Sequence, residues 1–130
     1  MKLIDILKQK NISFEVNAKG HISVGGGLVL RGCTGLTSLP DNLSVGGGLD
    51  LEGCEHFENV AFKKKCGRQN RTIFAAWVNG EVSIGAGCFL GSIDKFYNAV
   101  DESYSGEAAA KYKADADECV RSLVKKLNRE

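Results

Sequence analysis

The chain has 130 residues, of which 43% are hydrophobic and 25% charged, and its formal net charge is +1. These values are typical of one soluble globular domain, and they exclude a strong overall field that would attract nucleic acid or an anionic membrane. No apolar run approaches the roughly 20 residues that cross a bilayer, and the N-terminus lacks the apolar core of a secretory signal. We therefore expect a single cytoplasmic domain over residues 1–130.

The first segment, residues 1–21, is expected to form a cap. Leu3, Ile4 and Leu7 share one side of a helix over 2–9, which is too short to persist unless it docks. Residues 12–16 alternate apolar and polar side chains, and after a turn at 17–20 a second strand begins at 21–24. A helix and a hairpin of this kind would close one end of a stacked repeat structure.

A pattern then occurs twice between residues 22 and 62, displaced by 21 positions. It reads SVGGGLVLRGCTGLTSLP from Ser23 and SVGGGLDLEGCEHFENV from Ser44. In each copy the two alternate leucines point inward from a short parallel strand, and the glycines permit a tight bend before it. The glycines lack the Lys-Ser/Thr and the helix of a phosphate-binding loop, so we attribute them to repeat geometry.

The period and the Leu-x-Leu-x-x-Cys pattern resemble leucine-rich repeat proteins. The run Leu-Thr-Ser-Leu-Pro-Asp-Asn-Leu at 36–43 is similar to the bacterial LP-type subclass and to small phage and prophage accessory proteins. The resemblance covers about a third of the chain. It implies an α+β fold, a short solenoid sheet capped by an N-terminal helix and two C-terminal helices. It also implies a phage-encoded inhibitor of a host defence protein, comparable to an anti-CRISPR, in the host cytoplasm.

Two groups of residues are predicted to meet a partner. The outward side chains of the two repeat strands are Val29, Arg31, Asp50 and Glu52, with Arg31 stacked over Glu52. The segment 63–71 carries five basic residues and no acidic one: Lys63, Lys64, Lys65, Arg68 and Arg71. It is either a solvated loop or a site for phosphate, nucleic acid or an acidic surface, although it lacks interleaved aromatic residues for base stacking.

Residues 72–91 are predicted to form a hairpin or a degenerate further repeat. Asn79-Gly80 is a strong hairpin turn signal between strands at 72–78 and 81–84, and residues 82–87 echo 22–27. Trp77 is either an exposed anchor for a partner or a core residue. Residues 92–128 are predicted to form two helices, and Ser92 caps the first of them. These helices either seal the last repeat or pair two chains. Asp115 and Asp117 are assigned to a solvated face of the second helix.

The five cysteines, at positions 33, 54, 66, 88 and 119, show no metal-ligand spacing and no even-numbered disulfide framework. We expect buried, reduced thiols and no metal or other cofactor. Cys54 and His56 have no third group to form a catalytic set, and no cysteine begins the Cys-x-Asp motif of repeat-containing ubiquitin ligases.

The sequence therefore predicts a non-enzymatic protein-binding module, monomeric or homodimeric, with a host protein or complex as partner and no membrane partner. The alternative is a nucleic-acid-binding or phosphate-binding accessory protein that acts through the basic residues of 63–71.

Overall fold

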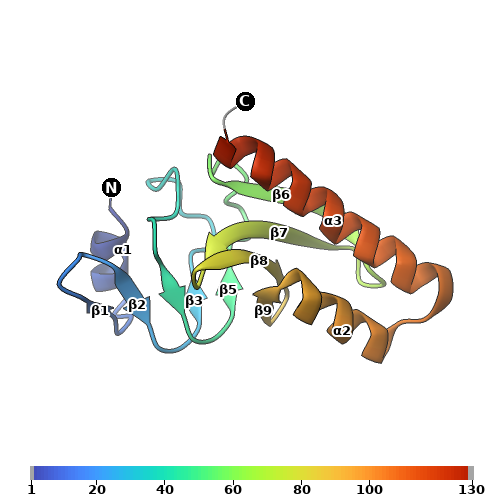
Figure 1. Ribbon diagram of the computed structural model, residues 1–130. Helices are drawn as coiled ribbons and strands as arrows, with labels where there is room; N and C mark the ends of the chain where they lie inside the picture. Colours follow the sequence, from blue (N-terminus) through green and yellow to red (C-terminus); the bar gives the residue numbers. More distant parts are fainter. Residues whose placement is uncertain (1, 129–130) are drawn as a thin grey trace.

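The computed structural model describes residues 2–128, which form three helices and nine strands (Figure 1). In chain order these are α1 (Leu3–Gln9), β1 (Glu15–Val16), β2 (Ile22–Val24), β3 (Leu28–Val29), β4 (Ser44–Val45), β5 (Leu49–Asp50), β6 (Val60–Cys66), β7 (Arg71–Val78), β8 (Glu81–Ala86), β9 (Phe89–Ser92), α2 (Ile93–Ser103) and α3 (Gly106–Asn128). The α+β class is thus confirmed.

Within the described residues the strands form three separate sheets, ordered β1-β2-β4, β3-β5 and β6-β7-β8-β9. The largest is antiparallel throughout. The predicted solenoid sheet is therefore wrong. The segment 72–91 is also not a further repeat, because its strands pair with one another in hairpins instead of continuing the stack.

The two copies of the repeated pattern lie side by side in parallel. Ser23 pairs with Ser44 and Leu28 with Leu49, each across the 21 positions that separate the copies. The Leu28 N–H donates to the Gly48 carbonyl at 2.9 Å, and further such bonds continue this ladder. Each strand has only two or three residues, because the glycines bend the chain within each copy and divide the stack into two small sheets.

Two turns of the antiparallel sheet end the stacking after the second copy. The Val45 N–H donates to Asn79 Oδ1 at 2.8 Å, and Asn79 Nδ2 donates to the Val45 carbonyl at 3.2 Å, so one side-chain amide occupies the edge of β4. At β5, the Cys88 carbonyl lies 3.2 Å from the place where a Cβ on Gly48 would stand. A third copy stacked on these edges would displace both turns.

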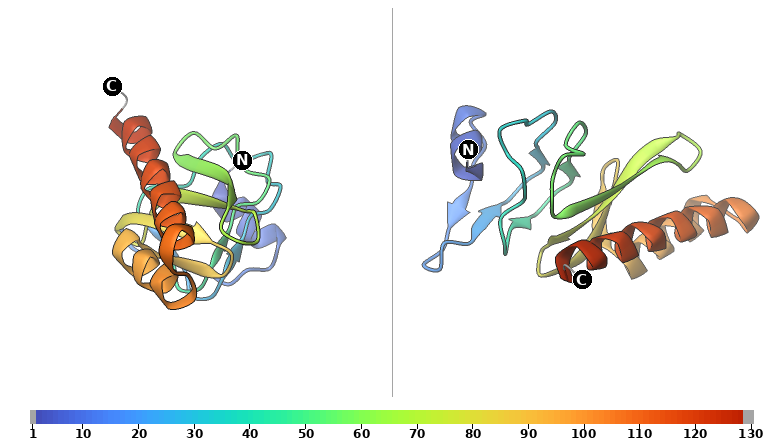
Figure 2. Two further views of the ribbon diagram at one scale, coloured as in Figure 1. Left: turned by 90° about the vertical axis from the view of Figure 1, so that its right-hand side faces the viewer. Right: turned by 90° about the horizontal axis from the view of Figure 1, so that it is seen from above.

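The four-stranded sheet separates two hydrophobic clusters. On one face Phe74, Ala76 and Val78 of β7 belong to the cluster of the repeat leucines, which continues to α1 at the far end of the repeats. On the other face Ile73 and Ala75 pack with the apolar sides of α2 and α3. Figure 2 shows the repeats and these two helices on opposite sides of the molecule. The C-terminal helices thus cover the antiparallel sheet and do not seal a repeat.

Several local predictions are confirmed. The hairpin β1–β2 pairs Glu15 with Ser23, Asn79 and Gly80 both have positive φ in the β7–β8 turn, and the Lys95 N–H donates to Ser92 Oγ at 3.3 Å at the start of α2. The assignment of Asp115 to a solvated face is wrong. Asp115 is only 7% exposed, and its carboxylate forms an ion pair with Lys111 at 3.2 Å. It faces the sheet because α3 lies flat across β6 and β7.

Candidate functional site

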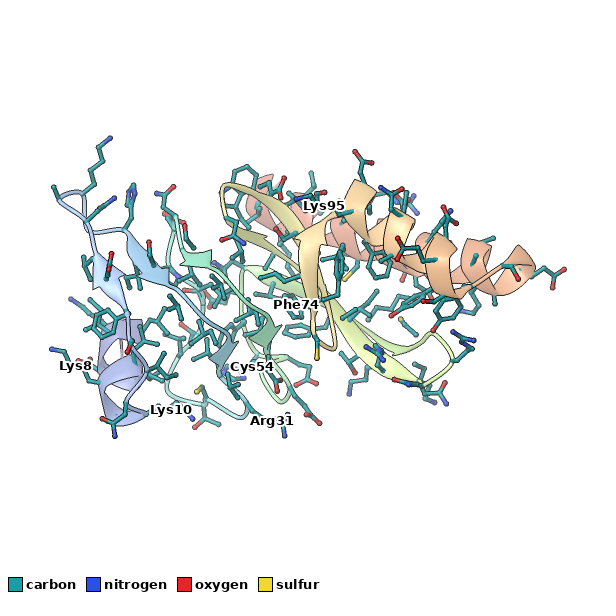
Figure 3. All side chains as sticks on the ribbon, turned by 90° about the horizontal axis from the view of Figure 1, so that it is seen from below. Lys8, Lys10, Arg31, Cys54, Phe74 and Lys95 are labelled. Carbon is teal, nitrogen blue, oxygen red and sulfur yellow. The ribbon has the colours of Figure 1, made fainter. Side chains whose placement is uncertain are left out.

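A groove of about 500 Å³ runs along β5 on the open side of the repeats. All four predicted outward residues, Val29, Arg31, Asp50 and Glu52, line it. Phe74 of β7 and the β8–β9 turn at Gly87 and Cys88 form the opposite wall, so the groove lies where the repeats meet the antiparallel sheet. Arg31 and Phe74 are labelled in Figure 3. We call it the β5 groove.

An ion-pair network forms the charged rim of the β5 groove. Arg31 Nη2 lies 2.6 Å from Asp50 Oδ2, and Arg31 Nε lies 3.3 Å from Glu52 Oε2. The predicted pair of Arg31 with Glu52 is confirmed, but Asp50 is the closer partner. Partial burial alone would raise the pKa of Asp50; the backbone N–H of Glu52 and the Arg31 guanidinium outweigh it and hold that pKa below its usual value. Two carboxylates share one cation, so the rim keeps an excess of negative charge.

The groove also borders a strand edge without a ladder partner. In the described part of the chain β3 is the one strand neighbour of β5. The Gly48 and Asp50 carbonyls accept bonds from the β3 side, at 2.9 Å from the Leu28 and Leu30 N–H groups. Backbone groups alternate in direction along a strand, so those of Leu49 face the other edge, toward the groove. Leu49 is only 2% exposed and the β8–β9 turn stands beside Gly48, so this edge is covered by the fold and the groove offers its side chains.

Sequence reasoning missed the far wall of the groove. Phe74, Gly87 and Cys88 come from strands that the sequence predicts as a separate unit, and only the folded β8–β9 turn brings them to β5. The sequence does contain one signal for this wall. Gly87-Cys88 is a short link between two apolar segments, which indicates a turn, and a turn places the Cys88 thiol at the surface.

The five cysteines are all free thiols, but they differ in environment. Cys54, Cys66 and Cys119 are buried, as expected, and Cys33 is half-buried. Burial raises the pKa of Cys66 to about 11 and that of Cys119 to about 12. The expectation of burial is wrong for Cys88, which is exposed because the β8–β9 turn carries it to the surface of the groove.

We expect Cys88 to react with a maleimide before any other thiol of the folded protein. The thiolate is the reacting form, and a raised pKa removes it from Cys66 and Cys119 at neutral pH, while burial blocks access. Mass spectrometry of timed labelling at pH 7 should show one fast adduct that Cys88→Ser abolishes. A fast adduct that survives in Cys88→Ser would contradict the described exposure.

The basic segment is not the predicted loop. Lys63, Lys64 and Lys65 lie in β6, a turn follows, and Arg71 begins β7, because the chain here forms a hairpin of the antiparallel sheet. Lys63 Nζ is paired with Glu118 Oε2 of α3 at 2.7 Å. Arg71 is hydrogen-bonded to the Gln69 side chain. Lys64 is exposed, and Lys65 and Arg68 line a second, smaller pocket.

Trp77 lies on β7, away from the β5 groove. Its side chain is 45% exposed, so of the two interpretations the core one is wrong. Alternation along β7 places it on the same face as Ala75, toward the helices, whereas Phe74 faces the repeats. The role of Trp77 in partner binding stays a prediction, and any contact there would be separate from the β5 groove.

Cys54 and His56 are engaged with different carbonyl groups. Cys54 Sγ donates to the Leu30 carbonyl at 3.0 Å, and His56 Nε2 lies 2.8 Å from the Leu36 carbonyl. Burial raises the pKa of Cys54, which disfavours its thiolate. Among residues 2–128 no three His, Cys, Asp or Glu side chains gather in a way that would hold a metal ion. The described geometry therefore offers no assembled nucleophile or metal centre.

Comparison of the chain with protein-family models, with curated proteins and with solved structures finds no match. None of the helices described here has the length and apolar character needed to cross a membrane.

Proposed function

We propose that this protein is a non-enzymatic protein-binding module that holds an extended segment of a partner protein in the β5 groove. The observation that carries the proposal is the groove of about 500 Å³, which places the exposed Val29 beside the carboxylates of Asp50 and Glu52. An extended segment laid along the groove can place alternate side chains against these residues. The repeats form a preorganised frame, which lowers the entropic cost of binding.

The charge and the exposed side chains of the β5 groove limit which partner segments can bind there. The carboxylates of Asp50 and Glu52 exceed the single Arg31 cation, so a lysine or arginine of the partner is the complementary charge. Val29 is 48% exposed on the same surface and offers an apolar contact. The expected segment is thus an extended one that carries an apolar and a cationic side chain.

A host protein is the proposed source of that segment, and the protein would act as an inhibitor by occupying it. The support for this part is the resemblance of the repeats to small phage and prophage proteins.

Val29→Asp is expected to weaken partner capture, because it replaces the apolar contact of the groove with a carboxylate that loses its hydration when an apolar side chain packs on it. Val16→Asp is the matched control, since Val16 is exposed to a similar degree, 45%, but lies on β1 outside the groove. The measurement is an affinity pull-down from host lysate with all three baits, followed by a direct Kd on the purified prey. We expect a weakening of at least about tenfold for Val29→Asp and less than about twofold for Val16→Asp.

Two outcomes would reject the proposal. One is a prey that binds Val29→Asp as well as the unchanged protein. The other is a loss of equal size in both variants, which would point to a general effect of charge. A further arm replaces Glu52 with lysine: capture should fall, because the added cation would repel the expected basic residue of the partner.

A further inference from the structure

A second pocket, of about 350 Å³, lies between the β6–β7 turn and the beginning of α3. We call it the hairpin pocket. Lys65, Arg68 and Asn70 line it from the hairpin, and Tyr104 and Lys111 line it from the helical side. These residues are up to 46 positions apart in the sequence, and they meet because α3 runs back along β6. The pocket is separate from the β5 groove, with which it shares no lining residue.

The hairpin pocket concentrates positive charge. Lys65 and Arg68 stand against one carboxylate in its lining, Glu107, while the third cation of the lining, Lys111, is paired with Asp115 at 3.2 Å. Lys63 and Arg71 are turned to Glu118 and Gln69, so the part of the basic segment that converges is the pair Lys65 and Arg68. The first turn of α3 adds the positive end of the helix dipole. These features together favour an anionic ligand.

Arg68 and Tyr104 form a fixed wall. The Arg68 guanidinium lies 4.2 Å from the centre of the Tyr104 ring and donates to the Ser103 carbonyl at 2.9 Å. The Arg68 backbone N–H donates to the Tyr104 hydroxyl at 3.1 Å. The ring also meets Tyr112 edge-on, with centroids 5.1 Å apart. An arginine held in this way keeps further N–H donors for an anion, and an aromatic wall suits a planar group.

Lys65 reaches the pocket from an irregular point of β6. The pairing with β7 shifts register between Lys63 and Cys66, and Lys65 has a φ of 60°, a value that costs energy for any residue with a side chain. Such bulges redirect side chains, and Lys64 next to it lines no pocket described here. A lysine at a position where glycine would be relaxed is consistent with a role for its ammonium group.

We propose that the hairpin pocket binds the phosphate monoester of a small planar molecule of nucleoside monophosphate size. Lys65 and Arg68 hold the phosphate, Asn70 offers a side-chain amide, and Tyr104 packs against the planar group. The volume falls in the range of small-ligand sites. A nucleic-acid strand fits less well, because a tracked backbone needs a stripe of free cations, and here they surround one pocket.

The test is calorimetric titration with adenosine monophosphate, inorganic phosphate and adenosine. We expect saturable binding of adenosine monophosphate, weaker binding of inorganic phosphate and no binding of adenosine. Lys65→Ala should weaken the binding of adenosine monophosphate at least about tenfold. Lys64→Ala removes the same charge from the adjacent residue and should change Kd less than about twofold. Val29→Asp, in the β5 groove, should leave it unchanged, which separates this proposal from the proposed function.

Lys65→Gly is the control for misfolding, because glycine adopts the positive φ at this position without strain. It should raise the thermal midpoint by about 2–4 °C and still lose the ligand. Absence of saturable binding up to about 10 mM nucleotide overturns the proposal, as does an equal loss in Lys64→Ala and Lys65→Ala, which would show general charge attraction. A third outcome would also overturn the proposal and assign the surface to nucleic acid. In it, a single-stranded oligonucleotide binds more tightly than adenosine monophosphate, its binding depends strongly on salt, and it needs Lys64 as much as Lys65.

Discussion

Gly46→Ala is expected to lower the free energy of unfolding by about 3 kcal/mol or more. A Cβ at Gly46 would stand 2.2 Å from the carbonyl oxygen of Gly25 in the neighbouring copy and 3.0 Å from its carbonyl carbon. Both are backbone atoms, so no side-chain rotation relieves the clash. The two copies would have to separate, and their ladder of hydrogen bonds would weaken.

The repeat supplies its own control. Gly25 is the equivalent residue of the first copy, and a Cβ there meets nothing within 4 Å. Gly25→Ala should therefore change stability by less than about 1 kcal/mol. Urea unfolding followed by circular dichroism measures both variants. Equal losses in the two would show that the glycines matter for local flexibility and not for the close approach of the copies.

Asn79→Gly is expected to cost about 2 kcal/mol. Glycine keeps the positive φ that the β7–β8 turn requires, so the turn itself survives. What is lost is the side-chain amide that bonds both the N–H and the carbonyl of Val45. Those two backbone groups at the edge of β4 would then have no partner, and leaving such groups unpaired is costly where they are partly buried.

Asn42→Gly is the matched control, because Asn42 has a similar φ of 61° and is exposed. It should change the free energy of unfolding by less than about 0.5 kcal/mol. Hydrogen exchange adds a local readout: the Val45 amide should exchange faster in Asn79→Gly and at its normal rate in Asn42→Gly. Unchanged protection of Val45 in Asn79→Gly would contradict the described bond.

Local signals in the sequence predict the parts of the fold that local physics determines. The 21-residue displacement predicts the pairing of Leu28 with Leu49, since matched leucines must enter the same core. Asn79-Gly80 predicts a turn through its tolerance of positive φ. Ser92 predicts the start of a helix because its hydroxyl accepts a free backbone N–H. The outward residues of the repeat strands follow from strand alternation.

Contacts between distant segments decide the rest, and no local pattern encodes them. That the Asn79 amide reaches back 34 positions to Val45 cannot be seen in an Asn-Gly pair, so the sequence does not show where the stack ends. The likeness of 82–87 to 22–27 misleads, because glycine-rich strand ends serve hairpins as well as repeats. The wall of the β5 groove at Phe74 and Cys88, and the meeting of Lys65 with Tyr104, also depend on packing across the whole chain.

The middle of β7, residues 73–76, is buried on both faces, and this has a consequence for how the molecule unfolds. Phe74, Ala76 and Val78 complete the core of the repeats, while Ile73 and Ala75 complete the core under the helices. Neither half can open without exposing apolar surface that belongs to the other. The two halves should therefore melt as one cooperative unit, and a fragment that ends before β6 should not fold. The repeats, which look like a portable module in the sequence, depend on a strand supplied by the other half of the chain.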